Sequence, residues 1–309
     1  MHLPRSIFSR KQLDLFLWLL RVNRVESVPS TKSMNLLNKM MQGNCGIDTI
    51  AYEGRLDHRY HVNGLSQILA QEMCNPKIRP NLYFYPEDTG LHLSQTRQAE
   101  RRLKEIRSED TTPMIRIHHS DYYIFEPAML ADRTVCIPHR WFTRSGHYYA
   151  MAWMLEARLG EGNIPGWVVR QDRELEVDES RFLKNFPQLS NDFKLYDVPS
   201  PTNIIGVYPN TPDAGFDSLQ RWTLTNPVLG NPWRVRACGH RTLCLPLWMY
   251  CDDTSGNMSK KWNEDNSFLF TLAGLPLEQS QKEFNVHFLC TSNLAPPLEM
   301  MEGVVDQVM

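Results

Sequence analysis

Several features that define common protein classes are missing from this sequence. It contains no stretch of about 18 uninterrupted apolar residues, so we expect no membrane span. Its 33 lysines and arginines against 35 aspartates and glutamates give a formal charge of −2, so no overall positive field attracts nucleic acid or an acidic membrane. It lacks a Walker loop, G-x-G-x-x-G and G-x-S-x-G, so we expect neither a nucleotide cofactor nor a common hydrolase site.

Cysteine is scarce and does not form a disulfide pattern. The chain has 7 cysteines, an odd number spread over 309 residues, and most of them lie within apolar runs. This usage is typical of reduced, buried thiols rather than of a disulfide framework. We therefore expect an intracellular protein, nuclear or cytoplasmic and not secreted. These cysteines are Cys136, Cys244, Cys251 and Cys290.

The N-terminal third is predicted to be mainly helical. Ser9 followed by Gln12 is a capping-box pattern, and apolar residues then recur at helical spacing to about Val25. Asp14 within the apolar run, and the absence of a small-residue cleavage site, favour a helix here over a signal peptide. Further helices are predicted over residues 31–42, 64–74 and 94–107.

The remaining patterns predict an α+β protein of about two domains by length alone. We expect a helical region at 1–110, a mixed region of irregular sheet at 111–184 and a linker or insertion rich in proline and asparagine at 185–234. The last region, 235–309, has strand-like runs at 242–252, 267–275 and 284–292, followed by a helix from Pro297 to about Val308.

Two adjacent carboxylates are the main candidates for chemistry. Asp252 and Asp253 follow the apolar run LPLWMYC and precede a Ser-Gly-Asn turn. Carboxylates at a strand end can bind Mg²⁺, which prefers oxygen ligands, and in phosphoryl transfer two such ions stand about 4 Å apart between several carboxylates. The competing interpretation is an ordinary turn, because Asp, Ser, Gly and Asn are common turn residues.

Two weaker patterns are also present. Lys260, Lys261 and Trp262 combine positive charge with a ring on which a base could stack, although the acids that follow also suit a solvated loop. His119 and Asp121, with a distant His240 or His287, match the ligand types of a non-haem iron oxygenase. Ordinary polar positions in a half-buried sheet explain this second pattern equally well.

Several long blocks resemble one known family. They include PMIRIHHSDYYIFEPAML, LPLWMYCDDTSGNMSKKWNEDNSFLFTLAGLP and FNVHFLCTSNLAPPLEM. The resemblance is to transposon-encoded proteins that are expanded in mushroom-forming fungi and are related to DDE-type transposases. It implies that the three C-terminal runs form a three-stranded antiparallel meander that opens a ribonuclease-H-like fold. Asp252 or Asp253 would then be the first catalytic, metal-binding carboxylate. Lys260, Lys261 and Trp262 would lie on an adjoining loop that faces the DNA.

The same resemblance implies limited activity. Members of the family continue for hundreds of residues and supply further acidic positions, so this chain is expected to be a truncated, transposase-like protein that does not catalyse strand transfer and binds DNA weakly. One alternative is a host-recruited interaction module that binds a protein partner or itself through exposed apolar surface. A remote alternative is the iron oxygenase.

Overall fold

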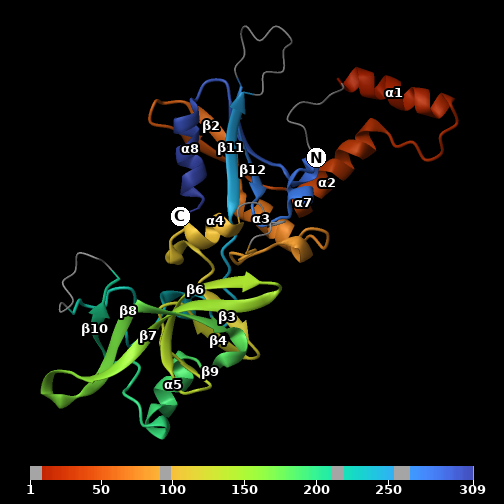
Figure 1. Ribbon diagram of the computed structural model, residues 1–309. Helices are drawn as coiled ribbons and strands as arrows, with labels where there is room; N and C mark the ends of the chain where they lie inside the picture. Colours follow the sequence, from red (N-terminus) through yellow and green to blue (C-terminus); the bar gives the residue numbers. More distant parts are fainter. Residues whose placement is uncertain (1–8, 91–98, 211–218, 254–264, 309) are drawn as a thin grey trace. The chain divides into compact units, whose positions relative to one another are not determined.

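The computed structural model describes residues 9–90, 99–210, 219–253 and 265–308, and it has the predicted α+β architecture (Figure 1). The helices are α1 (Arg10–Val22), α2 (Thr31–Cys45), α3 (Leu65–Cys74), α4 (Ala99–Lys104), α5 (Phe186–Asp192), α6 (Pro232–Arg236), α7 (Leu277–Ser280) and α8 (Pro297–Asp306). The strands are β1 (Thr49–Glu53), β2 (Arg59–Asn63), β3 (Met114–Ile117), β4 (Ser120–Tyr123), β5 (Ala128–Leu130), β6 (Val135–Arg144), β7 (His147–Leu159), β8 (Pro165–Asp178), β9 (Phe182–Lys184), β10 (Ile204–Tyr208), β11 (Leu247–Asp253), β12 (Asn266–Leu272) and β13 (His287–Ser292).

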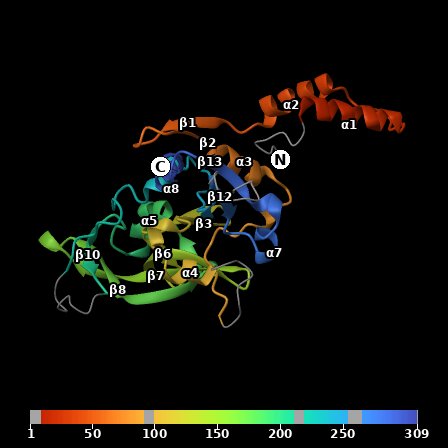
Figure 2. The same ribbon diagram turned by 90° about the horizontal axis from the view of Figure 1, so that it is seen from above.

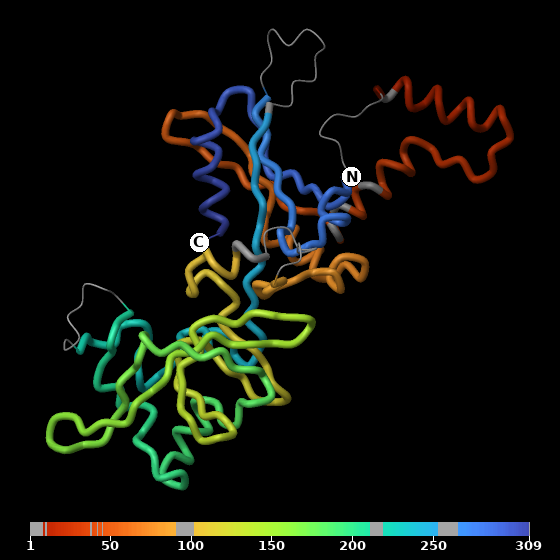
Figure 3. The backbone as a smooth tube through the Cα atoms, in the orientation of Figure 1, coloured from red at the N-terminus to blue at the C-terminus, as the bar shows by residue number. Residues whose placement is uncertain are grey.

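The chain divides into two compact units that differ from the four predicted regions. The first contains Met1–Cys74, Tyr250–Leu269 and Phe288–Met309, and the second contains Asn75–Met249 and Phe270–His287. Each unit is therefore assembled from segments that are far apart in the sequence. In the first, Figure 3 traces helix α8 alongside strand β2, where the Tyr60 hydroxyl donates to the Glu299 carbonyl at 2.8 Å.

The first two helices begin as the sequence predicts. The Gln12 amide donates to Ser9 Oγ at 3.3 Å, and the Ser9 amide donates to Gln12 Oε1 at 2.8 Å, which completes the capping box of α1. Helices α1 and α2 form a hairpin (Figures 1 and 2) in which Leu17 is buried. None of the described helices is long and apolar enough to cross a membrane.

A β-hairpin interrupts the region that was predicted to be mainly helical. Strands β1 and β2 pair antiparallel from Thr49 opposite Asn63 to Glu53 opposite Arg59, and β2 pairs with β13 where Val62 lies opposite Cys290. The strand order of this five-stranded sheet is β1-β2-β13-β12-β11. The three predicted C-terminal strands are thus neighbours in chain order, and the N-terminal hairpin extends the sheet beyond them.

The mixed region forms a more regular sheet than expected. Its order is β10-β8-β7-β6-β5-β9, with β6, β7 and β8 long and antiparallel and β10 parallel to β8. Trp141, Met129 and Val169 are fully buried in its core. The register shifts between Pro138 and Arg140, so that one extra residue lies in β6. Such a bulge changes the direction of nearby side chains.

The segment 185–234 was predicted to be a linker or insertion, and the structure differs. It contains α5, β10 and part of α6, and it contributes Leu189, Val207 and Trp222 to the same core. These side chains are at most 7 % exposed. The prediction failed because the buried residues are few and are separated by turn residues, which hides their periodicity.

Candidate functional site

The predicted carboxylates lie at the end of strand β11. Asp252 is exposed, and Asp253 is the last residue of the strand. Burial, and then the negative charge of Asp252, raise the pKa values of the neighbouring Tyr250 and Cys251. Strand β11 also stands at one end of the described strand order, beside β12. The strand therefore presents a carboxylate where an ion or a polar ligand can reach it.

The part of the chain that the structure describes does not complete a metal site around this strand end. Among the described residues, no group of three or more histidine, cysteine, aspartate or glutamate side chains could hold a metal ion. Lys260, Lys261 and Trp262, predicted to contact nucleic acid, lie outside the described residues. Two carboxylates are fewer ligands than a two-ion site requires.

The iron-site pattern is dispersed in the structure. Both carboxylate oxygens of Asp121 accept hydrogen bonds from Arg116, at 2.5 and 2.8 Å. The His287 ring lies 4.9 Å from that of Phe270, and burial lowers its pKa. The described part of the chain therefore does not bring His119 and Asp121 into a three-ligand cluster.

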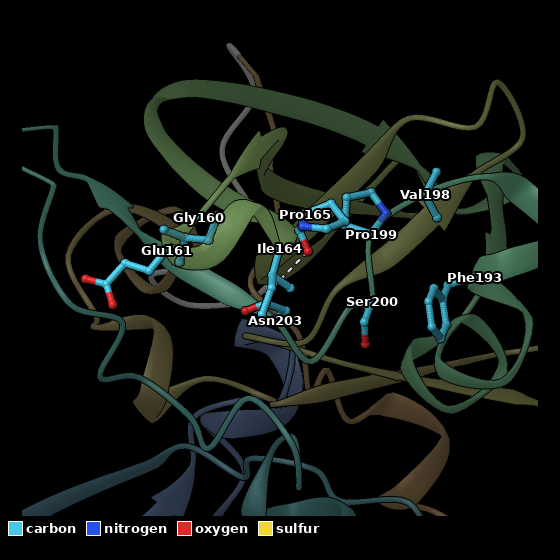
Figure 4. Close-up of a pocket in the computed structure, with 10 residues that line it drawn as sticks. Gly160, Glu161, Ile164, Pro165, Phe193, Val198, Pro199, Ser200 and Asn203 are labelled. Carbon is cyan, nitrogen blue, oxygen red and sulfur yellow. Dashed lines mark hydrogen bonds between the residues drawn. The ribbon is translucent and has the colours of Figure 1, made fainter.

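A pocket of about 560 Å³ opens beside the turn that joins β7 to β8 (Figure 4). Ile164, Phe193 and Val198 give it a largely apolar wall. The Asn203 side chain donates to the Pro165 carbonyl at 2.9 Å and fixes one side of the pocket. Its volume lies within the range of about 300 to 1,000 Å³ that is typical of small-molecule sites.

The chemistry of this pocket is limited. Glu161 is the one titratable residue among the described residues that line it, and it is exposed. Trp167 Nε1 donates to the Pro199 carbonyl at 3.1 Å, so the indole nitrogen behind the wall is satisfied. The pocket can hold an apolar group, but the described part of its lining offers no acid–base pair for catalysis.

A polar cluster on the long-stranded sheet was not identified from the sequence. It surrounds Arg140 and Arg144 of β6, and Arg144 forms ion pairs with Asp88 and Glu176. These residues match no motif. Asp88, the two arginines of β6 and Glu176 come from three segments that are far apart in the chain. The alternation of Arg140, Phe142 and Arg144 along a strand was the available signal, because residues two apart share one face of a sheet.

Comparison with known proteins identifies one family model. Residues 114–243 match a family described as a domain of unknown function (DUF8591). The match runs from β3 to just beyond α6, so it includes the whole β10-β8-β7-β6-β5-β9 sheet and ends before β11. No curated protein and no solved structure matches the chain.

Proposed function

We propose that this chain is a transposase-like protein of fungal mobile-element origin in which Asp252 and Asp253 are the first carboxylates of a divalent-metal site. The observation that carries the proposal is the arrangement of β11, β12 and β13, which are neighbours in chain order with the carboxylates at the end of the first of them. This order agrees with the meander that the resemblance implies. The long block of the resemblance from Leu245 to Met300 spans the same strands.

The same geometry supports a limited activity. Two-metal phosphoryl transfer places ions about 4 Å apart and needs several carboxylates to hold them. Asp252 and Asp253 would supply two ligands of such a site. Within the described residues, no group of three or more acidic, histidine or cysteine side chains could hold a metal ion. We therefore propose that this chain binds a single Mg²⁺ or Mn²⁺ ion weakly and neither cuts nor joins DNA.

The proposal extends to partner and location. A formal charge of −2 supports weak DNA binding, because affinity for DNA depends on neutralising phosphates with lysine and arginine. Cys74, Cys136, Cys238, Cys244, Cys251 and Cys290 are free thiols, which supports a reducing intracellular location, nuclear or cytoplasmic.

Manganese binding tests the carboxylate site. Titration of the protein with Mn²⁺, followed by electron paramagnetic resonance, is expected to give weak binding that is lost in the Asp252→Asn, Asp253→Asn double variant. Glu161→Gln with Glu278→Gln is the matched control, because it removes the same charge at two exposed acids far from β11 in the sequence. Equal binding by the two double variants would refute the metal site.

DNA cleavage tests the inactivity separately. Supercoiled plasmid incubated with the protein and Mg²⁺ or Mn²⁺ is expected to remain intact. Nicking or joining that depends on the metal and disappears in the Asp252→Asn, Asp253→Asn variant would show a complete catalytic site and overturn the proposed inactivity. The Glu161→Gln, Glu278→Gln control shows whether any lost activity is specific to β11.

An interaction module is the second candidate, and the α1–α2 hairpin favours it. Both helices expose large apolar side chains: Leu15, Phe16, Trp18, Leu19 and Val22 on α1, and Leu36, Leu37, Met40 and Met41 on α2. All are at least 49 % exposed. Clustered exposed apolar residues are typical of protein-interaction surfaces.

A measurement of self-association tests the interaction module separately from the transposase-like function. Sedimentation velocity over a range of concentrations is expected to show an oligomer that dissociates in a Trp18→Glu, Leu37→Glu variant. Leu195→Glu is the control, because Leu195 is 83 % exposed and lies in the other unit. A monomer at every concentration, for both wild type and variant, would remove self-association as the function of the hairpin.

A further inference from the structure

One face of the long-stranded sheet carries a row of polar side chains. Arg140, Phe142 and Arg144 alternate along β6 and so point to the same side of the sheet, whereas Trp141 between them is buried in the core on the other side. Met151 of β7 lies opposite Arg140 and also opposite Glu176 of β8. The row therefore crosses three adjacent strands.

These side chains line a pocket of about 340 Å³. Leu103 and Lys104 of α4 form another part of its lining, together with Asp88. The volume is at the lower end of the range of about 300 to 1,000 Å³ for small-molecule sites. All of these residues belong to one compact unit.

Arg144 pairs with both carboxylates that line this pocket. Arg144 Nε donates to Asp88 Oδ2 at 2.9 Å, and its Nη1 and Nη2 donate to the two oxygens of Glu176 at 2.5 and 2.8 Å. His139 Nε2 lies 2.6 Å from Oε1 of Glu174. Burial lowers the pKa of His139, although Glu174 opposes that shift, so the imidazole adds no positive charge at neutral pH.

Among the described residues, the hydrogen-bond partners of Arg140 carry no charge, although the negative charges of Glu174 and Glu109 act on its guanidinium. It is 9 % exposed, and its Nη2 donates to the Ile106 carbonyl and to Ser108 Oγ. Its Nε is buried and has no hydrogen-bond partner among the described residues. No described carboxylate lies within 4.0 Å of its guanidinium nitrogens. A buried guanidinium with an unused donor is costly unless an anion satisfies it.

We propose that this pocket binds the phosphate group of a small ligand, with Arg140 as the buried donor and Lys104 as a second cation at the exposed part of the lining. A guanidinium offers several N–H donors in a planar fork that matches phosphate oxygens, and a lysine ammonium adds a point charge. The pocket has room for a phosphate with a small attached group, as in a phosphate monoester. This site is independent of the carboxylates on β11.

Titration with inorganic phosphate at constant ionic strength tests the site. Calorimetry is expected to show saturable binding with one phosphate per chain, and sodium acetate at the same ionic strength serves as the reference anion. Arg140→Gln is expected to weaken binding about tenfold, because it removes a charge-assisted hydrogen bond. Arg133→Gln is the matched control, since Arg133 is exposed in the turn between β5 and β6.

A second variant tests the site even if the Arg140→Gln protein does not fold. Lys104 is exposed, so Lys104→Gln leaves the sheet intact and is expected to weaken phosphate binding about threefold through the loss of one cation. Lys77→Gln removes an exposed lysine elsewhere in the same unit and is expected to bind phosphate normally. Absence of saturable binding, or equal affinity in Lys104→Gln and Lys77→Gln, would overturn the proposal.

Two oligonucleotides identify the source of the phosphate. One carries a 5′-phosphate and the other, of the same sequence, a 5′-hydroxyl. If the phosphorylated strand binds more tightly and this advantage is lost in Lys104→Gln, the result supports the site with a DNA end as its ligand. If both strands bind equally while inorganic phosphate binds saturably, the result supports the site with a free phosphate ester as its ligand. The Asp252→Asn, Asp253→Asn variant should keep phosphate binding, which separates this result from the test of the metal site.

Discussion

Arg234 and Glu126 form a bidentate ion pair across 108 residues of sequence. Arg234 Nη2 lies 2.6 Å from Glu126 Oε2, and Nε lies 2.9 Å from Oε1. The Glu126 side chain is only 2 % exposed, and it also accepts the Asn231 amide at 2.9 Å. The Arg234 guanidinium stands 4.5 Å from the centre of the Tyr123 ring. This pair fixes the start of α6 to the turn between β4 and β5.

Removing the cation of this pair should destabilise the unit that contains it. Arg234→Met leaves the Glu126 carboxylate buried without an opposite charge, so we expect the free energy of unfolding to fall by about 3 kcal/mol. Urea denaturation followed by tryptophan fluorescence measures the change. Arg236→Met is the control, because Arg236 is exposed and its guanidinium stands over the Trp233 ring at 5.3 Å, and its effect should stay within about 0.5 kcal/mol.

The double variant Glu126→Gln, Arg234→Met tests whether the loss comes from the uncompensated charge. Replacing the carboxylate by a neutral amide should restore more than about 1 kcal/mol relative to Arg234→Met alone, since contacting residues are energetically coupled. If the two substitutions instead add, the ion pair contributes little and the effect of Arg234→Met reflects lost packing on Tyr123.

Alanine substitutions of two leucines in the segment 185–234, which was predicted to be a linker or insertion, should have very different effects on stability. Leu189 is fully buried in the core, whereas Leu195, six positions later, is 83 % exposed. We expect Leu189→Ala to lower the free energy of unfolding by about 2 to 5 kcal/mol through the cavity that it leaves. Leu195→Ala should change it by less than about 0.5 kcal/mol. Equal, small effects in thermal or urea unfolding would show that the segment is a linker after all.

Local signals in the sequence predicted the helices of the N-terminal third well, but not α5, α6 or α7. The Ser9–Gln12 capping box marks the start of α1, and Asn75-Pro76 directly follows α3, which ends at Cys74. These signals act over a few residues, so a single sequence contains them in full. The three C-terminal strands were also predicted, because each is an apolar run closed by turn residues.

Features that depend on distant contacts were not predictable. Strand β2 has only Tyr60 and Val62 buried, because the face it covers comes from β13 and α8 at the other end of the chain. In the half of β8 that follows Arg170, the residues from Gln171 to Glu174 are all polar, and only Leu175 and Val177 alternate with acids, so the strand signal was short there.

The candidate sites show the same contrast between local signals and contacts of distant segments. The position of Asp252 at a strand end followed from the apolar run before it. The pairing of Arg144 with Asp88 and Glu176 joins three separate elements, and no spacing in the sequence encodes it. Sequence reasoning can therefore identify a residue at the end of a local element, but it cannot identify a cluster that only the sheet register assembles.

Acid should weaken the contact between α8 and the β1–β2 turn. Burial opposes ionisation of Glu299, but hydrogen bonds from His58 at 2.8 Å and from the Leu56 amide at 2.8 Å outweigh it and lower the pKa of this carboxyl. A carboxyl with a lowered pKa in the folded state stabilises the fold above its unfolded pKa, and that contribution is lost as the pH falls through the folded value. Unfolding by urea at pH 7, 5, 4 and 3 should show this loss.

The variant Glu299→Gln isolates this contribution. It should be less stable than wild type at pH 7, and the difference should shrink as the pH falls, because the wild-type carboxyl then becomes protonated as well. Glu302→Gln is the control on the same helix, since Glu302 is 41 % exposed and pairs with the exposed Arg55. A difference between wild type and Glu299→Gln that stays constant from pH 7 to pH 3 would contradict the assignment.

The cysteines should react in an order set by exposure and by pKa. In a Cys45→Ser background, Cys74 and Cys238 are exposed and should react first with an aromatic disulfide reagent. Burial raises the pKa of Cys136 to about 12 and that of Cys290 to about 11, so these thiols should react only after unfolding. Cys74→Ser with Cys238→Ser should remove the fast phase, which identifies it.

Cys251 provides the most informative rate, because it reports on the carboxylate beside it. It is exposed, yet partial burial and the charge of Asp252 raise its pKa, so less thiolate is present at neutral pH. Its reaction should therefore be slower than that of the fast thiols and should accelerate as the pH rises. Asp252→Asn removes the negative charge and should speed the reaction at pH 7, whereas Glu278→Gln should not. An unchanged rate in Asp252→Asn would show that the carboxylate points away from the thiol, and the end of β11 would then lack the concentrated negative charge that binding a cation requires.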